Sequence, residues 1–203
     1  MEKGRQVRLF DRQARQYENR REGKTQQQWR KKLLKQADGE ILELSVGAGA
    51  NFPFYRPHVK ITAVDFSPEM LSKAKRAASH HSLNVDFILS DIEELEFQDH
   101  SFDTIVSTLS FCSYENPLRV LHKISRWCKP EGNILLMEHG ISSNFVASTV
   151  QKVLDPLLFR TIGCHHTRDM LGLISQTELS VQRVESYWLN TAHLIWAKPG
   201  KGK

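Results

Sequence analysis

The chain has 203 residues, of which 40% are hydrophobic and 25% are charged, as expected for one globular domain. This composition excludes a disordered chain, a collagen-like repeat and a disulfide-rich miniprotein. No window of eighteen uncharged apolar residues occurs, so the sequence predicts no membrane-spanning helix. The charged first 24 residues predict no secretory signal.

The net charge of +5 is concentrated in an N-terminal arm. Residues 1–36 contain 12 Lys and Arg against 4 Asp and Glu, whereas the remainder contains 16 basic and 19 acidic residues. Apolar residues recur at helical spacing over 10–17 and 29–37, which predicts two helices. A solvated helix surface accounts for most of this charge, and the alternative is an anionic partner such as nucleic acid or a membrane surface. The chain is therefore divided into an arm at 1–38, a body at 39–198 and a tail at 199–203.

The three cysteines, Cys112, Cys128 and Cys164, are few, odd in number and widely spaced. Reduced thiols in the cytosol are the expected state. Cys164 precedes two histidines, but Cys112 and Cys128 lack the paired spacing with it that a zinc site shows. We therefore predict no metal site.

The body alternates short apolar runs with amphipathic segments. A parallel sheet covered on both faces explains this pattern. The last two runs are separated by only three residues, which is too short for a crossover, so they must pair antiparallel. The sequence thus predicts a doubly wound α/β sheet that is mostly parallel, with seven strands and a C-terminal antiparallel hairpin. The expected strands are 41–46, 60–65, 85–89, 102–109, 133–138, 179–187 and 191–197, the helices are 68–81 and 117–127, and 129–132 is a turn.

A nucleotide-binding turn is predicted where the first strand runs into Gly47-Ala48-Gly49-Ala50-Asn51. Glycine is required where a tight turn needs unusual dihedral angles and where the backbone approaches a ligand closely. Asp65 follows eighteen positions after Gly47 and ends the second strand. A carboxylate at that place accepts hydrogen bonds from ribose hydroxyls.

The residues after this loop favour S-adenosylmethionine over NAD. The dinucleotide fingerprint needs a third small residue where the helix crosses the strand closely. Phe52 and Pro53 stand there instead, and the following helix is expected to end near Pro57. Adenosine with a methionine tail needs the tight turn and the ribose carboxylate but no seat for a diphosphate.

Five motifs resemble the class I S-adenosylmethionine-dependent methyltransferases, and the resemblance extends over about residues 7–198. It implies a Rossmann-like doubly wound fold. The opening segment 10–18 is similar to the quinone-type branch of methyltransferase domain 11, and segments 137–140, 151–156 and 163–169 are similar to small phospholipid N- and thiol S-methyltransferases. The motifs are 43–49 (ELSVGAG), 65–70 (DFSPEM), 90–95 (SDIEEL), 102–109 (FDTIVSTL) and 129–132 (KPEG).

This resemblance implies that the body binds S-adenosylmethionine and leaves S-adenosylhomocysteine. Asp65 would bind the ribose, Asp91 and the Ile92 amide the adenine, and the two loop glycines the amino-acid tail. Glu43 would reach the amino group through water. Ser45 replaces the usual first glycine, and its hydroxyl is hypothesised to bind the tail. The complete predicted set is Glu43, Ser45, Val46, Gly47, Ala48, Gly49, Asn51, Asp65, Phe66, Ser67, Met70, Asp91, Ile92, Glu93, Thr108, Leu109 and Ser110.

Two residues are candidates on the acceptor side. His139, at the end of the fifth strand, is the best candidate general base because imidazole titrates near neutral pH. Hydrogen bonding to the backbone is the equally weighted structural alternative. Tyr17 is a candidate lid residue. Pro156 is expected to end a helix, and Trp188 is expected in the core.

The sequence therefore predicts a cytoplasmic methyltransferase that moves a methyl group to a quinone, phospholipid amine or thiol by in-line displacement. We expect no nucleic-acid partner, because 107–110 reads Ser-Thr-Leu-Ser in place of the motif of base amino-methylases. Peripheral membrane contact through the basic arm is an open alternative. RNA methylation and an inactive cofactor-binding partner protein are the competing hypotheses, and neither the acceptor nor the oligomeric state follows from the residues.

Overall fold

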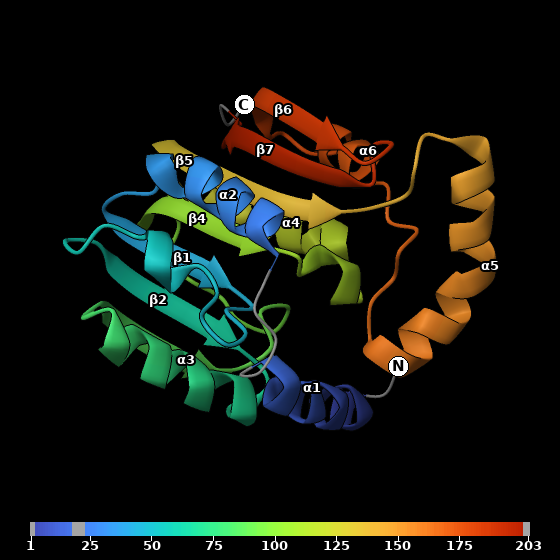
Figure 1. Ribbon diagram of the computed structural model, residues 1–203. Helices are drawn as coiled ribbons and strands as arrows, with labels where there is room; N and C mark the ends of the chain where they lie inside the picture. The colour runs from blue at the N-terminus through green and yellow to red at the C-terminus, as the bar shows by residue number, and fades with distance from the viewer. Residues whose placement is uncertain (1–2, 18–22, 201–203) are drawn as a thin grey trace.

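The computed structural model describes residues 3–17 and 23–200, without the side chains of residues 15–17. Seven strands form one sheet in the order β3-β2-β1-β4-β5-β7-β6 (Figure 1). All pairs from β3 to β5 are parallel, and β7 pairs antiparallel with both β5 and β6. The strands are β1 (Glu40–Leu44), β2 (Lys60–Asp65), β3 (Asn84–Leu89), β4 (Phe102–Thr108), β5 (Cys128–His139), β6 (Ser180–Tyr187) and β7 (Ala192–Lys198). The predicted doubly wound sheet with a reversed hairpin is confirmed.

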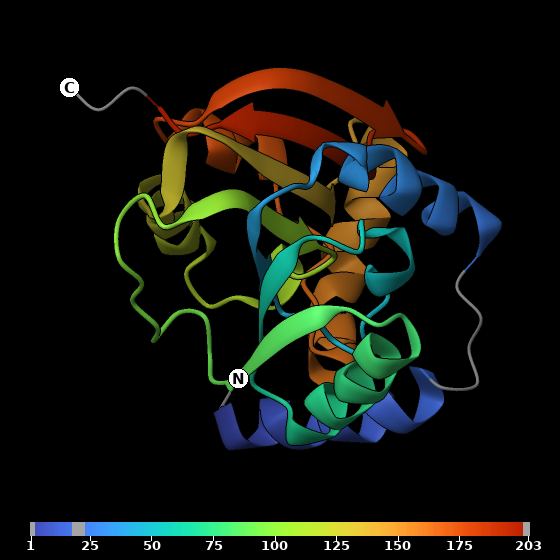
Figure 2. The same ribbon diagram turned by 90° about the vertical axis from the view of Figure 1, so that its left-hand side faces the viewer.

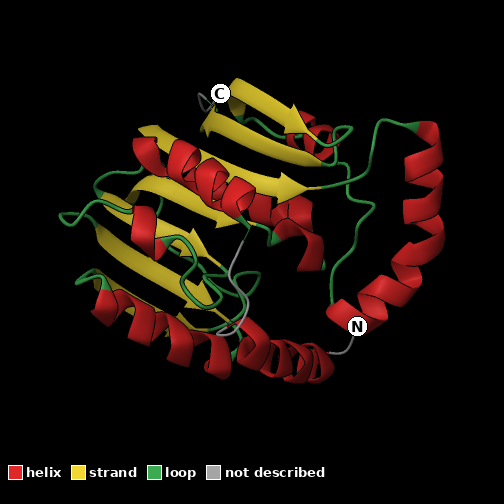
Figure 3. Cartoon of the chain, viewed as in Figure 1, coloured by secondary structure: helices red, strands yellow, loops and turns green. Residues whose placement is uncertain are grey.

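Helices cover both faces of this sheet (Figures 2 and 3). On one face, Leu33 and Leu71 share a buried cluster, and on the other face Leu121 and Ile174 share a second one. These residues come from α2 and α3 on the first face and from α4 and α6 on the second. The helices are α1 (Lys3–Tyr17), α2 (Lys24–Leu33), α3 (Pro68–His80), α4 (Pro117–Trp127), α5 (Phe145–Ile162) and α6 (Met170–Ser175), with short 3-10 turns η1 (Leu34–Gln36), η2 (Phe52–Phe54) and η3 (Phe111–Ser113).

The start of α3 shows how the sequence places the binding edge. Ser67 accepts a hydrogen bond from the Met70 amide, and Pro68 occupies the first helical position. Only two residues, Phe66 and Ser67, therefore separate the end of β2 at Asp65 from the start of α3. This tight junction leaves the end of β2 next to the loop that follows β1.

Two local predictions are wrong. The segment 129–132 is not a turn but the first part of β5, where the register against β4 shifts between Phe102 and Thr104. Such an irregularity accommodates Pro and Gly within a strand. Pro156 does not end a helix but lies inside α5. It is on the exposed side, where solvent can hydrogen-bond the carbonyl of Lys152 that the ring leaves without a partner.

The reversal between β6 and β7 corrects the expectation for Trp188. Three consecutive residues, Trp188, Leu189 and Asn190, have positive φ angles. This compact turn directs side chains outward, and Trp188 is 59% exposed. Trp29 of α2 is buried instead, stacked on Tyr187 with a ring separation of 4.6 Å.

Among residues 3–17 and 23–200, no helix is both long and apolar enough to cross a membrane.

Candidate active site at the carboxyl ends of the strands

The loop after β1 and the end of β2 meet through Asp65. One carboxylate oxygen of Asp65 accepts a hydrogen bond from the Gly47 amide at 2.8 Å, and the other accepts one from the Ser67 amide at 2.9 Å. Burial is the main cause that raises the pKa of Asp65 to about 6. The carboxylate is therefore fixed between two backbone amides at the carboxyl edge of the sheet, where open α/β sheets bind ligands.

The glycine loop fits a nucleoside-containing cofactor. Gly47 has a φ of 56°, and a Cβ built there would meet no atom within 4 Å. The loop therefore borders open space beside the Asp65 carboxylate. Gly49 is required for another reason: its φ is 83°, and a Cβ would lie 2.7 Å from the Phe52 ring. Val46 is buried, and Ala48 is half-buried beside this loop.

Ser45 has a φ of 47°, a conformation that favours glycine. Its hydroxyl lies 3.0 Å from the Tyr114 hydroxyl, which also donates to Ser110 at 3.0 Å. In this conformation the Ser45 hydroxyl is hydrogen-bonded within the protein, to Tyr114. The hydroxyl contact to a methionine tail thus stays a hypothesis.

Glu43, Asn51 and Thr108 form one hydrogen-bonded network. The Asn51 amide donates to Glu43 at 2.9 Å and to Thr108 at 3.1 Å. Tyr55 also donates to Glu43, and Arg30 of the arm donates to both Asn51 and Thr108. Burial is the main cause that raises the pKa of Glu43 to about 7. The arm is thereby attached to the loop by a buried guanidinium.

The segment after β3 carries the residues expected at the adenine. Asp91 accepts a hydrogen bond from the Glu93 amide at 2.9 Å, and Ile92 is buried. Glu93 in turn accepts from the amides of Glu115 and Asn116. The Nζ atom of Lys3, at the start of α1, lies 3.3 Å from a carboxylate oxygen of Asp91, so α1 packs over this segment.

The contacts of α1 with the end of β2 are direct. Ser67 donates to Asp11 at 2.5 Å, and Phe66 packs edge-on against Phe10 at 5.2 Å. Met70, also predicted at the site, is buried behind Ser67. The side chain of Tyr17 lies outside the described part of the chain, so its lid role stays a prediction.

Glu138, next to the candidate base, has no exposed surface. It accepts hydrogen bonds from the Ser107 hydroxyl at 2.7 Å and from the amides of Ser110 and Phe111. Burial is the main cause that raises the pKa of Glu138 to about 7. This carboxyl group holds the turn after β4, including the predicted residue Ser110, against the end of β5.

Replacing Glu138 by glutamine should change how stability depends on pH. Because folding raises the pKa from 4.5 to about 7, Glu138 contributes stability below pH 4.5 that is lost as the pH rises through 7. The glutamine variant does not titrate there. Its unfolding free energy relative to wild type should therefore increase by as much as about 3 kcal/mol between pH 4.5 and 8.

Urea unfolding at several pH values measures this difference. Glu131→Gln, on the exposed part of the same strand, is the matched control for the loss of one carboxylate. A Glu138→Gln offset from wild type that does not change with pH would contradict the buried titration.

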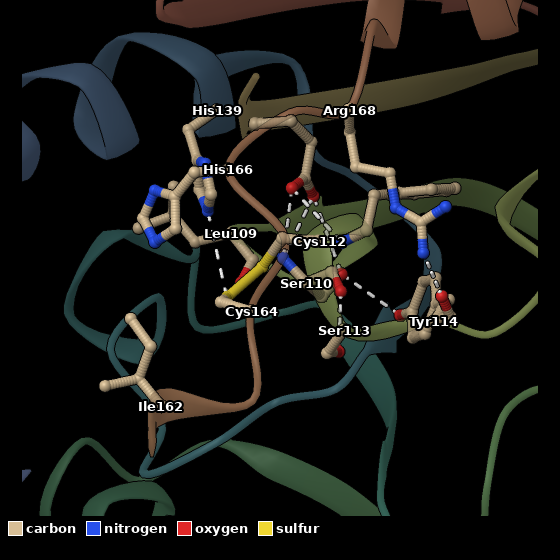
Figure 4. The surroundings of a disulfide bond; sticks show 12 residues. Leu109, Ser110, Cys112, Ser113, Tyr114, His139, Ile162, Cys164, His166 and Arg168 are labelled. Atoms are coloured by element: carbon tan, nitrogen blue, oxygen red, sulfur yellow. Dashed lines mark hydrogen bonds between the residues drawn. A yellow bond between two sulfur atoms is a disulfide. The ribbon is translucent and has the colours of Figure 1, made fainter. Parts of the chain in front are cut away.

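His139 lies beside the cysteine pair (Figure 4). Its Nε2 atom is 3.8 Å from Cys164 Sγ, and its ring centre is 4.7 Å from that of His166. Burial lowers the pKa of His139 to about 4, and His166 adds to this effect. His139 is therefore neutral at physiological pH, but it is a weaker base than ordinary histidine.

Cys112 and Cys164 form a disulfide with a Cα–Cα distance of 4.9 Å. The expectation of three reduced thiols is thus wrong for two of them, while Cys128 is free and buried. Sequence spacing could not reveal the pair, because Cys112 follows β4 and Cys164 follows α5. The two sulfur atoms and a ring nitrogen of His139 also lie within 4.8 Å of one another.

A cavity of about 330 Å³ adjoins the end of β5. His139, His166 and the predicted residue Leu109 line it together with Trp29 and Trp188. The two indole rings and a mostly apolar lining suit a small, largely apolar molecule, and polar side chains such as Gln151 also reach the cavity. The cavity and the glycine loop after β1 both lie at the carboxyl edge of the sheet, on opposite sides of β4.

The chain is similar in sequence to known methyltransferases. The model of the methyltransferase domain family matches residues 42–136. Thiol S-methyltransferase TMT1B of Rattus norvegicus is 35% identical over 162 residues, which are 76% of this chain and 66% of that protein. The chain belongs to the methyltransferase domain family. Membership in this family implies S-adenosylmethionine as the methyl donor.

This methyltransferase-family chain is also similar to a second curated relative and to a solved structure. Phosphatidylethanolamine N-methyltransferase of Cereibacter sphaeroides is 31% identical over 129 residues, which are 63% of each chain. Geranyl diphosphate methyltransferase in complex with SAM has the same fold, with a TM-score of 0.71 at 13% identity over 86% of this chain and 84% of that one. The chain spans about two thirds or less of the length of the curated relatives it matches.

Sequence reasoning missed several residues of this site, namely Arg30, Tyr55, Ser107, Tyr114 and Glu138. Glu138 could have been found, because it is the one charged residue at the end of the apolar run 134–138. Arg30 could not, because nothing distinguishes it from the other basic residues of the arm.

Proposed function

We propose that this protein transfers the methyl group of S-adenosylmethionine to a small or lipid-like acceptor of the thiol, phospholipid-amine or quinone type. The observation that carries the proposal is the Asp65 carboxylate, held by the Gly47 and Ser67 amides beside open space. A fixed carboxylate at the end of the second strand is the group that binds ribose hydroxyls. Family membership supports the donor, and the names of the relatives support the acceptor classes.

The chain's own residues would bind, orient and exclude water. Asp65 would bind the ribose, Asp91 and Ile92 the adenine, and the loop from Ser45 to Gly49 the amino-acid tail. The arm would cover the cofactor, since Lys3 and Asp11 already contact the predicted adenine and ribose segments. The cofactor supplies an activated methyl group, and holding the acceptor near attack distance then provides most of the remaining acceleration.

The cavity beside β5 is the proposed acceptor site. Its lining favours a small apolar molecule or the reactive end of a larger one. A thiol is the first acceptor to test, because a thiol needs little help to ionise near neutral pH. A weak base such as His139 is adequate for it, whereas a less acidic acceptor would need a stronger one.

Calorimetry with S-adenosylmethionine and S-adenosylhomocysteine tests the donor, and methyl transfer to a panel of an alkyl thiol, phosphatidylethanolamine and a demethylated quinol tests the acceptor. Tight NADH binding in place of both compounds would contradict the proposal. Cofactor binding without transfer to any acceptor would favour the inactive partner protein. RNA binding that weakens steeply with salt would favour nucleic-acid methylation.

His139→Gln should lower kcat for a thiol acceptor by about tenfold, less than the hundredfold or more that a well-matched base contributes. The low pKa of His139 is the reason for the smaller effect. Steady-state kinetics separates kcat from KM, and exposed His81→Gln is the matched control. An unchanged kcat with a raised KM would show that His139 only lines the cavity.

A further inference from the structure

Helix α5 carries an apolar surface that no part of the described chain covers. None of its 18 residues is buried, and in Figure 1 it forms one edge of the molecule, away from the sheet. Its largest apolar side chains repeat at helical spacing on the outer side. Six exposed apolar residues of α5 are Phe145 (83%), Val146 (69%), Val150 (52%), Val153 (73%), Leu154 (43%) and Leu157 (61%), and a seventh, Ile162 (39%), ends the helix.

The inner side of α5 is where its polar groups are satisfied. Gln151 donates to the carbonyls of Gly140 and His166 and accepts from the Ser142 amide. Asp155 accepts from the His166 amide and contacts His165 at 2.7 Å. Gln151 and Asp155 are four residues apart, so they define the face toward the protein. The apolar side chains lie on the opposite side of α5 and therefore point outward.

The β6–β7 turn extends this surface. Trp188 is 59% exposed and Leu189 is 64% exposed. The Leu189 carbonyl accepts from the Ser143 amide and the Ser142 hydroxyl, which fixes the turn beside the start of α5. Together α5 and this adjoining turn expose nine large apolar side chains, whereas single exposed ones are normal on a surface.

The exposed charges of α5 are of one sign. Asp155, the sole acidic residue of α5, is engaged on the inner side, whereas Lys152 and Arg160 are exposed. Apolar side chains on α5, an exposed Trp on the adjoining β6–β7 turn and only positive exposed charges on the helix favour contact with a membrane interface. Basic side chains near anionic lipids add about 1 kcal/mol each to binding.

We propose that α5 and the β6–β7 turn lie on an anionic lipid surface, and that the acceptor enters the cavity from that surface. Trp188 belongs both to the exposed patch and to the cavity lining, and Gln151 lines the cavity from the inner side of α5. The acceptor is then an amphiphilic molecule that partitions into the lipid layer. This second part rests on the proposed function, whereas the lipid contact does not.

Flotation with vesicles of phosphatidylcholine, with and without phosphatidylglycerol, tests the lipid contact. Wild type should bind the anionic vesicles. Val153→Glu with Leu157→Glu should lower the partition coefficient by about tenfold or more, since two inserting side chains become charged. The matched control, Val181→Glu with Val184→Glu, makes the same charge change at exposed apolar positions of β6 and should stay within about twofold of wild type.

Equal vesicle binding by wild type and the α5 variant would overturn the proposal. So would the absence of vesicle binding by wild type. Self-association that the α5 variant abolishes, without vesicle binding, would show that a second copy covers the patch. Calorimetry with S-adenosylmethionine on the same three proteins separates the lipid contact from the proposed function. Vesicle binding without cofactor binding would refute the proposed function alone. Cofactor binding without vesicle binding would refute the lipid contact alone.

Discussion

Asp65→Ala is expected to weaken binding of S-adenosylmethionine at least a hundredfold. Two ribose hydroxyls would lose an ionised acceptor, and hydrogen bonds to charged groups contribute about 1.5–3 kcal/mol each. Since burial raises the pKa of Asp65 to about 6, binding to wild type should also weaken as the pH falls through 6. Isothermal titration calorimetry at pH 5 and pH 8 measures both effects.

The control must separate cofactor contact from loop collapse, because Asp65 also holds the Gly47 and Ser67 amides. Asp65→Asn keeps one acceptor oxygen, so it can keep one of these two amide contacts, and it should still lose most of the affinity. Asp86→Ala, an exposed carboxylate on the neighbouring strand β3, should bind normally. Wild-type affinity of the Asp65→Asn variant would show that the Asp65 carboxylate does not bind the ribose.

The disulfide between Cys112 and Cys164 should contribute about 4 kcal/mol to stability. It closes a loop over a sequence separation of 52 residues, and the loss of chain entropy in the unfolded state grows with that length. Urea unfolding with and without a reductant measures the contribution. Cys112→Ala with Cys164→Ala should unfold at a lower urea concentration than oxidised wild type.

The double variant also supplies the matched control, because a reductant should lower the stability of wild type and leave the variant unchanged. Cys128 is free in all of these proteins, so its contribution cancels. Three reactive thiols in wild type that has been unfolded without a reductant would show that the bond is absent.

The regular part of the fold follows from local pattern. The helix over 68–80 was predictable because Ser67 and Pro68 are capping residues, and the antiparallel hairpin because a three-residue connection cannot form a crossover. The predictions of a turn at Pro130 and of a helix end at Pro156 were wrong for a related reason. A strand irregularity accommodates the first proline and a solvent-exposed helix side the second, and local sequence shows neither.

For this protein, the order of residues alone determined the strand–loop–strand unit that brings Gly47 to Asp65, since the two residues are only 18 positions apart in the chain. Only tertiary structure decided which distant groups join them. Arg30 contacts Thr108, Cys112 bonds Cys164, and α5 turns its apolar side outward. Contacts between separate elements depend on packing and burial, and the spacing of residues along the chain contains neither.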